Sequence, residues 1–136
     1  MARLRVDSVY GSTRRELVKQ IRAFNQKAAG KDNYLPLAIT LRDSKQMYGG
    51  LVGCSYWDWM HIELLWIAER RRRKGLGRSL IRKAESEARK RGVRNVLVGT
   101  FSFQAPGFYK KLGYREFGRL KNFPPGYHQS WLSKAL

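Results

Sequence analysis

Cysteine and histidine are scarce in this sequence, which holds a single cysteine, Cys54, and 2 histidines. One cysteine has no partner within the chain for a disulfide. Metal sites generally need several clustered Cys, His or carboxylate ligands, and the sequence does not indicate such a cluster. We therefore expect a reducing compartment and no metal ion.

Long hydrophobic runs are also lacking. No stretch approaches the roughly 18 apolar residues of a membrane span, and residues 1–12 have no uninterrupted apolar segment of the signal-peptide kind. Linkers, repeats and low-complexity segments are absent as well. Because 136 residues can build one core but hardly two, we expect a cytoplasmic protein with a single domain over residues 1–136 and no membrane contact.

Acidic residues are few, with 10 Asp and Glu against 28 Lys and Arg, so the net charge is +18. Such a field attracts polyanions and repels cations at long range. Residues 69–91 alone hold 11 of the basic side chains and 3 acidic ones. A nucleic-acid-binding basic module is therefore one hypothesis, although no helix-turn-helix, zinc-ligand spacing or RNA-binding aromatic motif accompanies the charge.

Apolar residues are plentiful, at 43% of the chain, and their spacing changes along it. Residues 3–10 could form a short strand. A helix follows, with Ser12 or Thr13 as its N-cap and Gly30 as its stop. Its apolar residues with helical spacing are Leu17, Ile21 and Phe24.

The middle of the chain predicts three strands. Residues 34–43 and 46–60 are apolar runs around a polar "DSKQ", which favours an antiparallel pair. Residues 61–69, "HIELLWIAE", are apolar at nearly every position, as in a central strand covered on both faces.

Residues 77–91 have the period of an amphipathic helix that ends before Gly92. Possible ion pairs join Lys83 to Glu87 and Glu85 to Arg89. The apolar stripe consists of Leu80, Ile81, Ala84 and Ala88.

The remaining chain predicts a strand at 94–101, a short helix at 105–113, a strand at 114–123 and a last strand within 127–136. A turn at Pro124–Gly126 separates the last two strands. This order of elements is typical of an α/β domain with a mixed sheet.

Two glycines, Gly75 and Gly77, lie between the predicted central strand and the amphipathic helix. Glycine permits positive φ and close backbone approach, and a helix N-terminus offers unpaired N–H groups, so this turn suits a phosphate. A dinucleotide fingerprint would need a small residue in place of Leu80, and no P-loop is present. The remaining motif is R-x-x-G-x-G, from Arg72 to Gly77.

This motif, followed some 30 residues later by "APGFYKKLGY", resembles the GNAT superfamily of acetyl-CoA-dependent N-acetyltransferases. The resemblance covers about residues 30–136. It implies a mixed, mostly antiparallel sheet of about six to seven strands, flanked by helices and with a splayed central strand pair. It also implies acetyl-CoA as co-substrate and a primary amine as acceptor.

The resemblance further implies a set of CoA contacts: backbone amides of the turn for the pyrophosphate, and backbone groups of the central strand for the pantetheine arm. Many members have Asn where this chain has Ser102, so one hydrogen bond of the family is in question. The implied contact residues are Trp66, Ile67, Ala68, Arg72, Arg73, Lys74, Gly75, Leu76, Gly77, Arg78, Ser102, Ala105 and Phe108.

Direct acetyl transfer needs a base for the ammonium and an acid for the thiolate. Glu63 or His61, two residues apart on one strand face, could be the base. We favour Glu63, because a carboxylate among residues 64–66 would have a raised pKa. Tyr109 matches the family's acid. The structural alternatives are an ion pair between Glu63 and an arginine, a strand-capping role for His61, and simple packing of Tyr109.

We expect the acceptor to be an amine on a small molecule or a peptide, and the basic field favours an acidic or neutral one, or one bound to an anionic scaffold. The first helix, the loop after it and the last strands should form its pocket. A non-catalytic acyl-CoA-binding protein, as monomer or homodimer, is a further alternative. The aromatic and histidine residues that could line the acceptor pocket are Tyr56, Trp57, Trp59, Tyr127 and His128.

Overall fold

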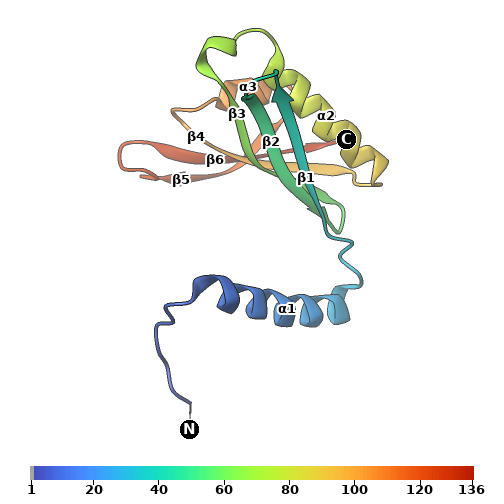
Figure 1. Cartoon of the computed structure of the whole chain (residues 1–136), viewed down its shortest axis with the longest axis vertical. Helices are drawn as coiled ribbons and strands as arrows, with labels where there is room; N and C mark the ends of the chain where they lie inside the picture. The colour runs from blue at the N-terminus through green and yellow to red at the C-terminus, as the bar shows by residue number, and fades with distance from the viewer. Residues whose placement is uncertain (1) are drawn as a thin grey trace. The chain divides into compact units, whose positions relative to one another are not determined.

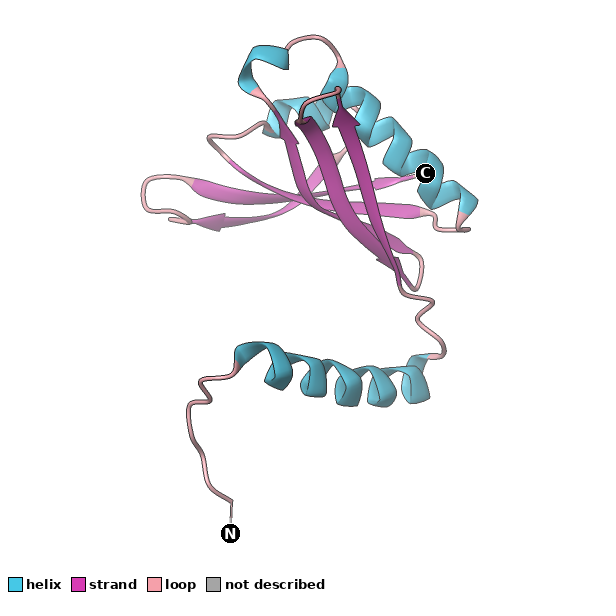
Figure 2. Ribbon diagram, in the orientation of Figure 1, coloured by secondary structure: helices cyan, strands magenta, loops and turns pink. Residues whose placement is uncertain are grey.

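The computed structural model describes residues 2–136, which form two compact units (Figure 1). The first unit ends at Asp32, and the second runs from Asn33 to Leu136. The sheet lies entirely in the second unit (Figure 2). A single domain over residues 1–136 stays a prediction. No helix among residues 2–136 is long and apolar enough to cross a membrane.

The first unit consists of an extended segment and the helix α1, Tyr10–Ala29. The predicted strand at 3–10 is wrong, since these residues pair with no strand. The helix also begins before Ser12, because Asp7 supplies the acceptors at its start. Val9 N donates to Asp7 Oδ1 (3.0 Å), and Thr13 Oγ1 donates to Asp7 Oδ2 (2.9 Å).

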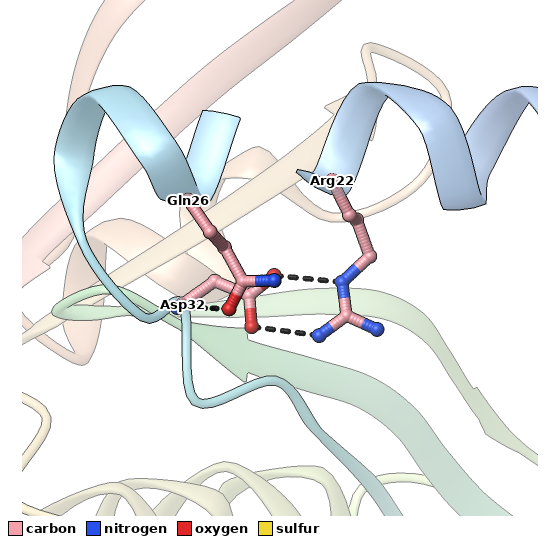
Figure 3. A network of polar contacts seen from close by, with 3 residues as sticks. All are labelled: Arg22, Gln26 and Asp32. Carbon is pink, nitrogen blue, oxygen red and sulfur yellow. Dashed lines mark hydrogen bonds and ion pairs between the residues drawn. The ribbon is translucent and has the colours of Figure 1, made fainter. Parts of the chain in front are cut away.

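The end of α1 is closed by a small polar network (Figure 3). Gly30 takes positive φ (87°), as a helix stop requires, and its N–H donates to Gln26 O. Two guanidinium nitrogens of Arg22 each donate to one oxygen of Asp32, both at 2.8 Å. Asp32 N donates to Gln26 Oε1 (3.2 Å). The predicted stop at Gly30 is therefore confirmed.

The second unit is built on a six-stranded mixed sheet in the order β1-β2-β3-β4-β6-β5. Only the β3–β4 pair is parallel. This confirms the predicted antiparallel hairpin and the central position of β3. The strands are β1 Leu35–Arg42, β2 Met47–Tyr56, β3 Trp59–Ile67, β4 Asn95–Phe101, β5 Arg115–Lys121 and β6 His128–Ala135.

The central pair splays as the resemblance implied. β3 and β4 pair only where Trp59–Ile62 faces Asn95–Val98, and beyond that point the two strands diverge (Figure 1). The β2–β3 register shifts at the same level: Gly53 faces Ile62, Val52 faces Leu64, and Glu63 is left as the extra residue of a bulge. The sheet thus opens where Glu63 stands.

Helix α2, Leu76–Lys90, packs on one face of the sheet against β1–β4. Its predicted apolar stripe is buried, and Gly92 follows it with positive φ. The short 3-10 helix η1, Glu69–Arg71, precedes α2, and α3, Pro106–Lys111, follows β4. The buried core joins α2 to β3, β4 and β6 through residues that include Met60, Ile62, Leu80, Ile81, Val96, Val98 and Leu132.

One predicted ion pair is confirmed and the other is wrong. Lys83 Nζ lies 3.8 Å from Glu87 Oε1. Glu85 does not pair with Arg89, because it is on the buried side of α2. Its Oε2 accepts hydrogen bonds from Tyr114 OH and Lys134 Nζ, each at 2.9 Å.

The prediction that β3 is covered on both faces is wrong as well. Met60 and Ile62 are buried under α2, whereas Leu64 is 67% exposed and Trp66 is 50% exposed. β3 has many apolar residues because it borders the open split between β3 and β4. A strand that borders a binding cavity can be as apolar as one inside a core.

Candidate active site

A cavity of about 860 Å³ lies in the split between β3 and β4, a size typical of small-ligand sites. It is lined by the end of β3, the glycine turn, the start of α2, the end of β4 and the α3 segment. Its lining includes most of the site residues predicted from the sequence, namely Glu63, Trp66, Ile67, Arg72, Arg73, Gly75, Leu76, Gly77, Arg78, Ala105, Phe108 and Tyr109.

The glycine turn has the backbone of an anion site. Arg73 and Gly75 both take positive φ, 63° and 76°, and α2 begins directly afterwards at Leu76. Arg72 Nε donates to Ile67 O (2.9 Å), which fixes the turn to the end of β3. The N–H groups of the first helical turn have no acceptor within the helix and lie at its positive end.

Gly77 lies so close to the ring of Phe108 that a larger residue would be tightly packed there. A Cβ added at this position would lie 3.2 Å from Phe108 Cζ, tighter than most real contacts of this kind. The start of α2 and the α3 segment thus meet at one wall of the cavity. The turn therefore fits a bound pyrophosphate, since the first amides of α2 have no partner within the helix.

The charge of the turn also fits an anion. Among residues 2–136, no carboxylate lies within ion-pair distance of Arg73, Lys74 or Arg78. Arg71, by contrast, pairs with Asp43 at 3.1 Å and lies over the ring of Tyr48. The lining of the cavity therefore includes cationic side chains, Arg73 and Arg78, that no acidic residue neutralises.

The backbone of β3 faces the split at alternate residues. Ala68 N donates to Tyr48 O (2.8 Å) and Ala68 O accepts from Arg71 N, so both backbone groups of Ala68 already have partners. Backbone groups alternate between the two sides of a strand, which directs those of Leu65 and Ile67 away from β2 and into the split. The sequence analysis missed Leu65, because strand register was needed to choose it over Trp66.

Glu63 lines the cavity as the extra residue of the β-bulge and is exposed. The apolar surroundings expected for its carboxylate are therefore not found. Among the described residues it makes no ion pair with an arginine, and so that alternative is not seen. His61 is half-buried beside the Trp131 ring, with centroids 6.2 Å apart, and does not line the cavity.

Cys54 is a neighbour of Glu63 that the sequence did not indicate. It is buried on β2 directly opposite His61. Burial raises the pKa of its thiol to about 11, and the nearby Glu63 carboxylate contributes in the same direction. The thiol is thus protonated at neutral pH.

Tyr109 both packs in the core and lines the cavity. It is 6% exposed, and its ring meets those of Phe108 and Tyr114 at centroid distances of 5.0 and 5.9 Å. Burial raises the pKa of the phenol to about 12, so the hydroxyl holds its proton at neutral pH. Packing and an acid role are therefore compatible in one side chain.

Several predicted site residues lie outside the cavity lining. Ser102 Oγ accepts from His128 N (3.1 Å) and Ser102 N donates to His128 O (2.8 Å), so this residue ties its loop to β6. The others absent from the lining are Ala68, Lys74, Tyr56, Trp57, Trp59, Tyr127 and His128. Two further aromatic side chains of the lining, Phe101 and Phe103, were not predicted.

Comparison with known proteins shows the family of this chain. The model of the acetyltransferase (GNAT) family matches residues 6–114, so it spans most of the chain. The chain therefore belongs to the GNAT acetyltransferase family, whose members use acetyl-CoA.

Individual proteins similar to this chain are also named as acetyltransferases. Blasticidin-S acetyltransferase of Streptomyces morookaense is 44% identical over 67% of this chain and 68% of its own length. Acetyltransferase Atu2258 of Agrobacterium fabrum is 34% identical over 84% of each chain. The crystal structure of a putative acetyltransferase from Agrobacterium tumefaciens aligns with a TM-score of 0.92, 28% identity and full coverage of both chains.

Proposed function

We propose that this protein transfers an acetyl group from acetyl-CoA to a primary amine on a small molecule. The observation that carries the proposal is the cavity in the β3–β4 split. It has a phosphate-type turn along its lining, and the lining also includes a carboxylate, Glu63, and a protonated phenol, Tyr109.

Backbone and charge at the turn would hold the cofactor. The amides of residues 73–78 and the unpaired cations Arg73 and Arg78 suit the pyrophosphate and the phosphate of CoA. The backbone of Leu65 and the N–H of Ile67 can extend the β3 edge with hydrogen bonds to the amides of the pantetheine arm, whereas Ile67 O already accepts from Arg72 Nε. Lys74 stands outside the cavity and would add only long-range attraction.

Two proton transfers would be carried by side chains of this chain. Acetyl-CoA supplies the activated acetyl thioester when bound. Glu63 accepts a proton from the acceptor ammonium and so frees its lone pair, while His61, set back beside Trp131, is the weaker candidate. Tyr109 gives its proton to the departing sulfur, and its depth in the core excludes water from that step.

Two aromatic side chains of the lining favour a small acceptor. Phe101 and Phe103 stack on each other, with ring centroids 5.5 Å apart and planes 4° from parallel. Such a platform suits an acceptor that carries a flat ring. The relative that is a blasticidin-S acetyltransferase supports a small amine-bearing antibiotic as the class of acceptor.

The proposal is tested by a panel of amines with acetyl-CoA, followed by mass spectrometry of the products. We expect one class of small amines to gain an acetyl group at a rate that depends on the enzyme. Thermal stabilisation by CoA without any product would contradict catalysis and favour the acyl-CoA-binding alternative. A salt-sensitive nucleic-acid shift without a CoA effect would contradict the whole proposal.

A further inference from the structure

Three side chains that can bind a metal meet beside the split. Cys54 Sγ, a ring nitrogen of His61 and a carboxylate oxygen of Glu63 all lie within 4.8 Å of one another. The sequence analysis expected no such cluster, because the three residues are not spaced like a metal motif. Strand pairing brings them together.

The backbone accounts for the convergence. Cys54 of β2 and His61 of β3 are directly opposite each other in the antiparallel register, so their side chains leave the same face of the sheet. Met60 and Ile62 point to the other face, into the core beneath α2. Residues two positions apart on a strand leave the same face, so Glu63, the extra residue of the bulge, lies next to the pair.

The donor set has the chemistry of a zinc site. Thiolate, imidazole and carboxylate are the three ligand types that Zn²⁺ takes in proteins, and three protein ligands leave a fourth position open. Zinc–ligand bonds of about 2.0 to 2.3 Å place two donor atoms of one ion at most about 4.6 Å apart, which is close to the 4.8 Å within which these atoms lie. Glu63 is exposed, which gives an ion a path from solvent, while Cys54 is buried and would anchor it.

We propose that Cys54, His61 and Glu63 bind one Zn²⁺ ion, and that this ion inhibits acetyl transfer. On binding, the Cys54 thiol loses its proton to the buffer and a sulfur–zinc bond forms. The carboxylate of Glu63 becomes a zinc ligand and no longer accepts a proton from the acceptor amine. The inhibition rests on the proposed role of Glu63 as base, whereas the metal site itself does not.

Binding is measured first, on the untagged protein in thiol-free buffer. Co²⁺ replaces Zn²⁺ as a spectroscopic probe, because a cobalt–thiolate bond gives a charge-transfer band in the near ultraviolet and tetrahedral cobalt absorbs in the visible. We expect both bands and their loss on addition of Zn²⁺. Since Cys54 is the single cysteine, absence of the charge-transfer band would overturn the site without any variant.

Variants assign the ligands. Cys54→Ala, with folding checked by circular dichroism, should weaken Zn²⁺ binding at least about tenfold in calorimetry, since even outer partners of metal ligands are worth that much. His61→Gln is the second variant and should have a similar effect. His128→Gln is the matched control, as the other histidine of the chain, and should bind Zn²⁺ like the original protein. Equal loss in the control, or none in Cys54→Ala, would contradict the assignment.

Inhibition is measured last, by mass spectrometry of the acetylated amine, which avoids interference from zinc bound to free CoA. We expect Zn²⁺ to slow transfer and a chelator to restore it. Cys54→Ala, compared with its own zinc-free rate, should be much less sensitive. Zinc binding without inhibition would overturn the inhibitory role. Because the cobalt spectrum needs no activity, a failure of the acetyltransferase proposal is distinguishable from a failure of the metal site.

Discussion

Two regions beside the β3–β4 split are built in different ways. The turn between β3 and α2 is one continuous segment, residues 72–78, and the binding groups that we propose for it are largely backbone amides. The cluster at the bulge takes Cys54 from β2 and two residues from β3, and depends on how those strands align. A contiguous backbone site can be found from its motif, whereas a side-chain cluster across strands exists only through register.

The largest expected effect comes from filling the turn. Gly77→Glu should abolish CoA binding in calorimetry, because its Cβ would press on Phe108 and its carboxylate would stand where the turn attracts an anion. Gly118→Glu in β5, where a Cβ meets nothing within 4 Å, adds the same charge elsewhere and should bind CoA normally. Unchanged affinity in Gly77→Glu would mean that the turn is not the phosphate site.

The role of the bulge residue is tested by Glu63→Gln, a substitution that keeps the size of the side chain and removes its charge. We expect the rate of acetyl transfer to fall about 10³-fold, within the usual contribution of a general base, with CoA affinity unchanged. His61→Gln provides the comparison, and its rate should fall much less. A greater loss in His61→Gln would make the histidine the base instead.

Tyr109→Phe separates chemistry from packing on the α3 wall. Removal of the hydroxyl alone should lower turnover about 10²-fold, with CoA affinity and melting temperature nearly constant. With a phenol pKa of about 12, the original enzyme should lose no rate through Tyr109 between pH 7 and pH 10. An unaltered rate in Tyr109→Phe would assign the residue to packing alone.

The smallest expected effect concerns contact between Cys54 and Glu63. Because burial and the carboxylate raise the thiol pKa to about 11, Cys54 should react slowly with a small methylthiolating reagent at pH 8. Glu63→Gln should speed this reaction several-fold, as followed by mass spectrometry. Glu116→Gln, a carboxylate on β5, is the control and should not change it. Equal rates in all three proteins would show that the two side chains do not interact.

Much of the fold followed from local patterns. The apolar stripe of α2, with Leu80 and Ala84 at helical spacing, marked the buried face of that helix correctly. The same reasoning missed the burial of Glu85. Its hydrogen-bond partners, Tyr114 and Lys134, lie far along the chain, so no local pattern indicated them. The apolar residues Leu64 and Trp66 led to the wrong prediction that β3 is covered on both faces. Apolar side chains can line a cavity as well as fill a core.

The family, the glycine turn and the order of elements from the first helix onward follow from the sequence alone, because these depend on short segments whose backbone preferences act locally. Tertiary structure alone decided which backbone groups of β3 face the split, how deep Tyr109 lies and that Cys54 joins His61 and Glu63. Each of these depends on where one strand pairs with the next. A shift of register by one residue would turn every side chain concerned to the other face.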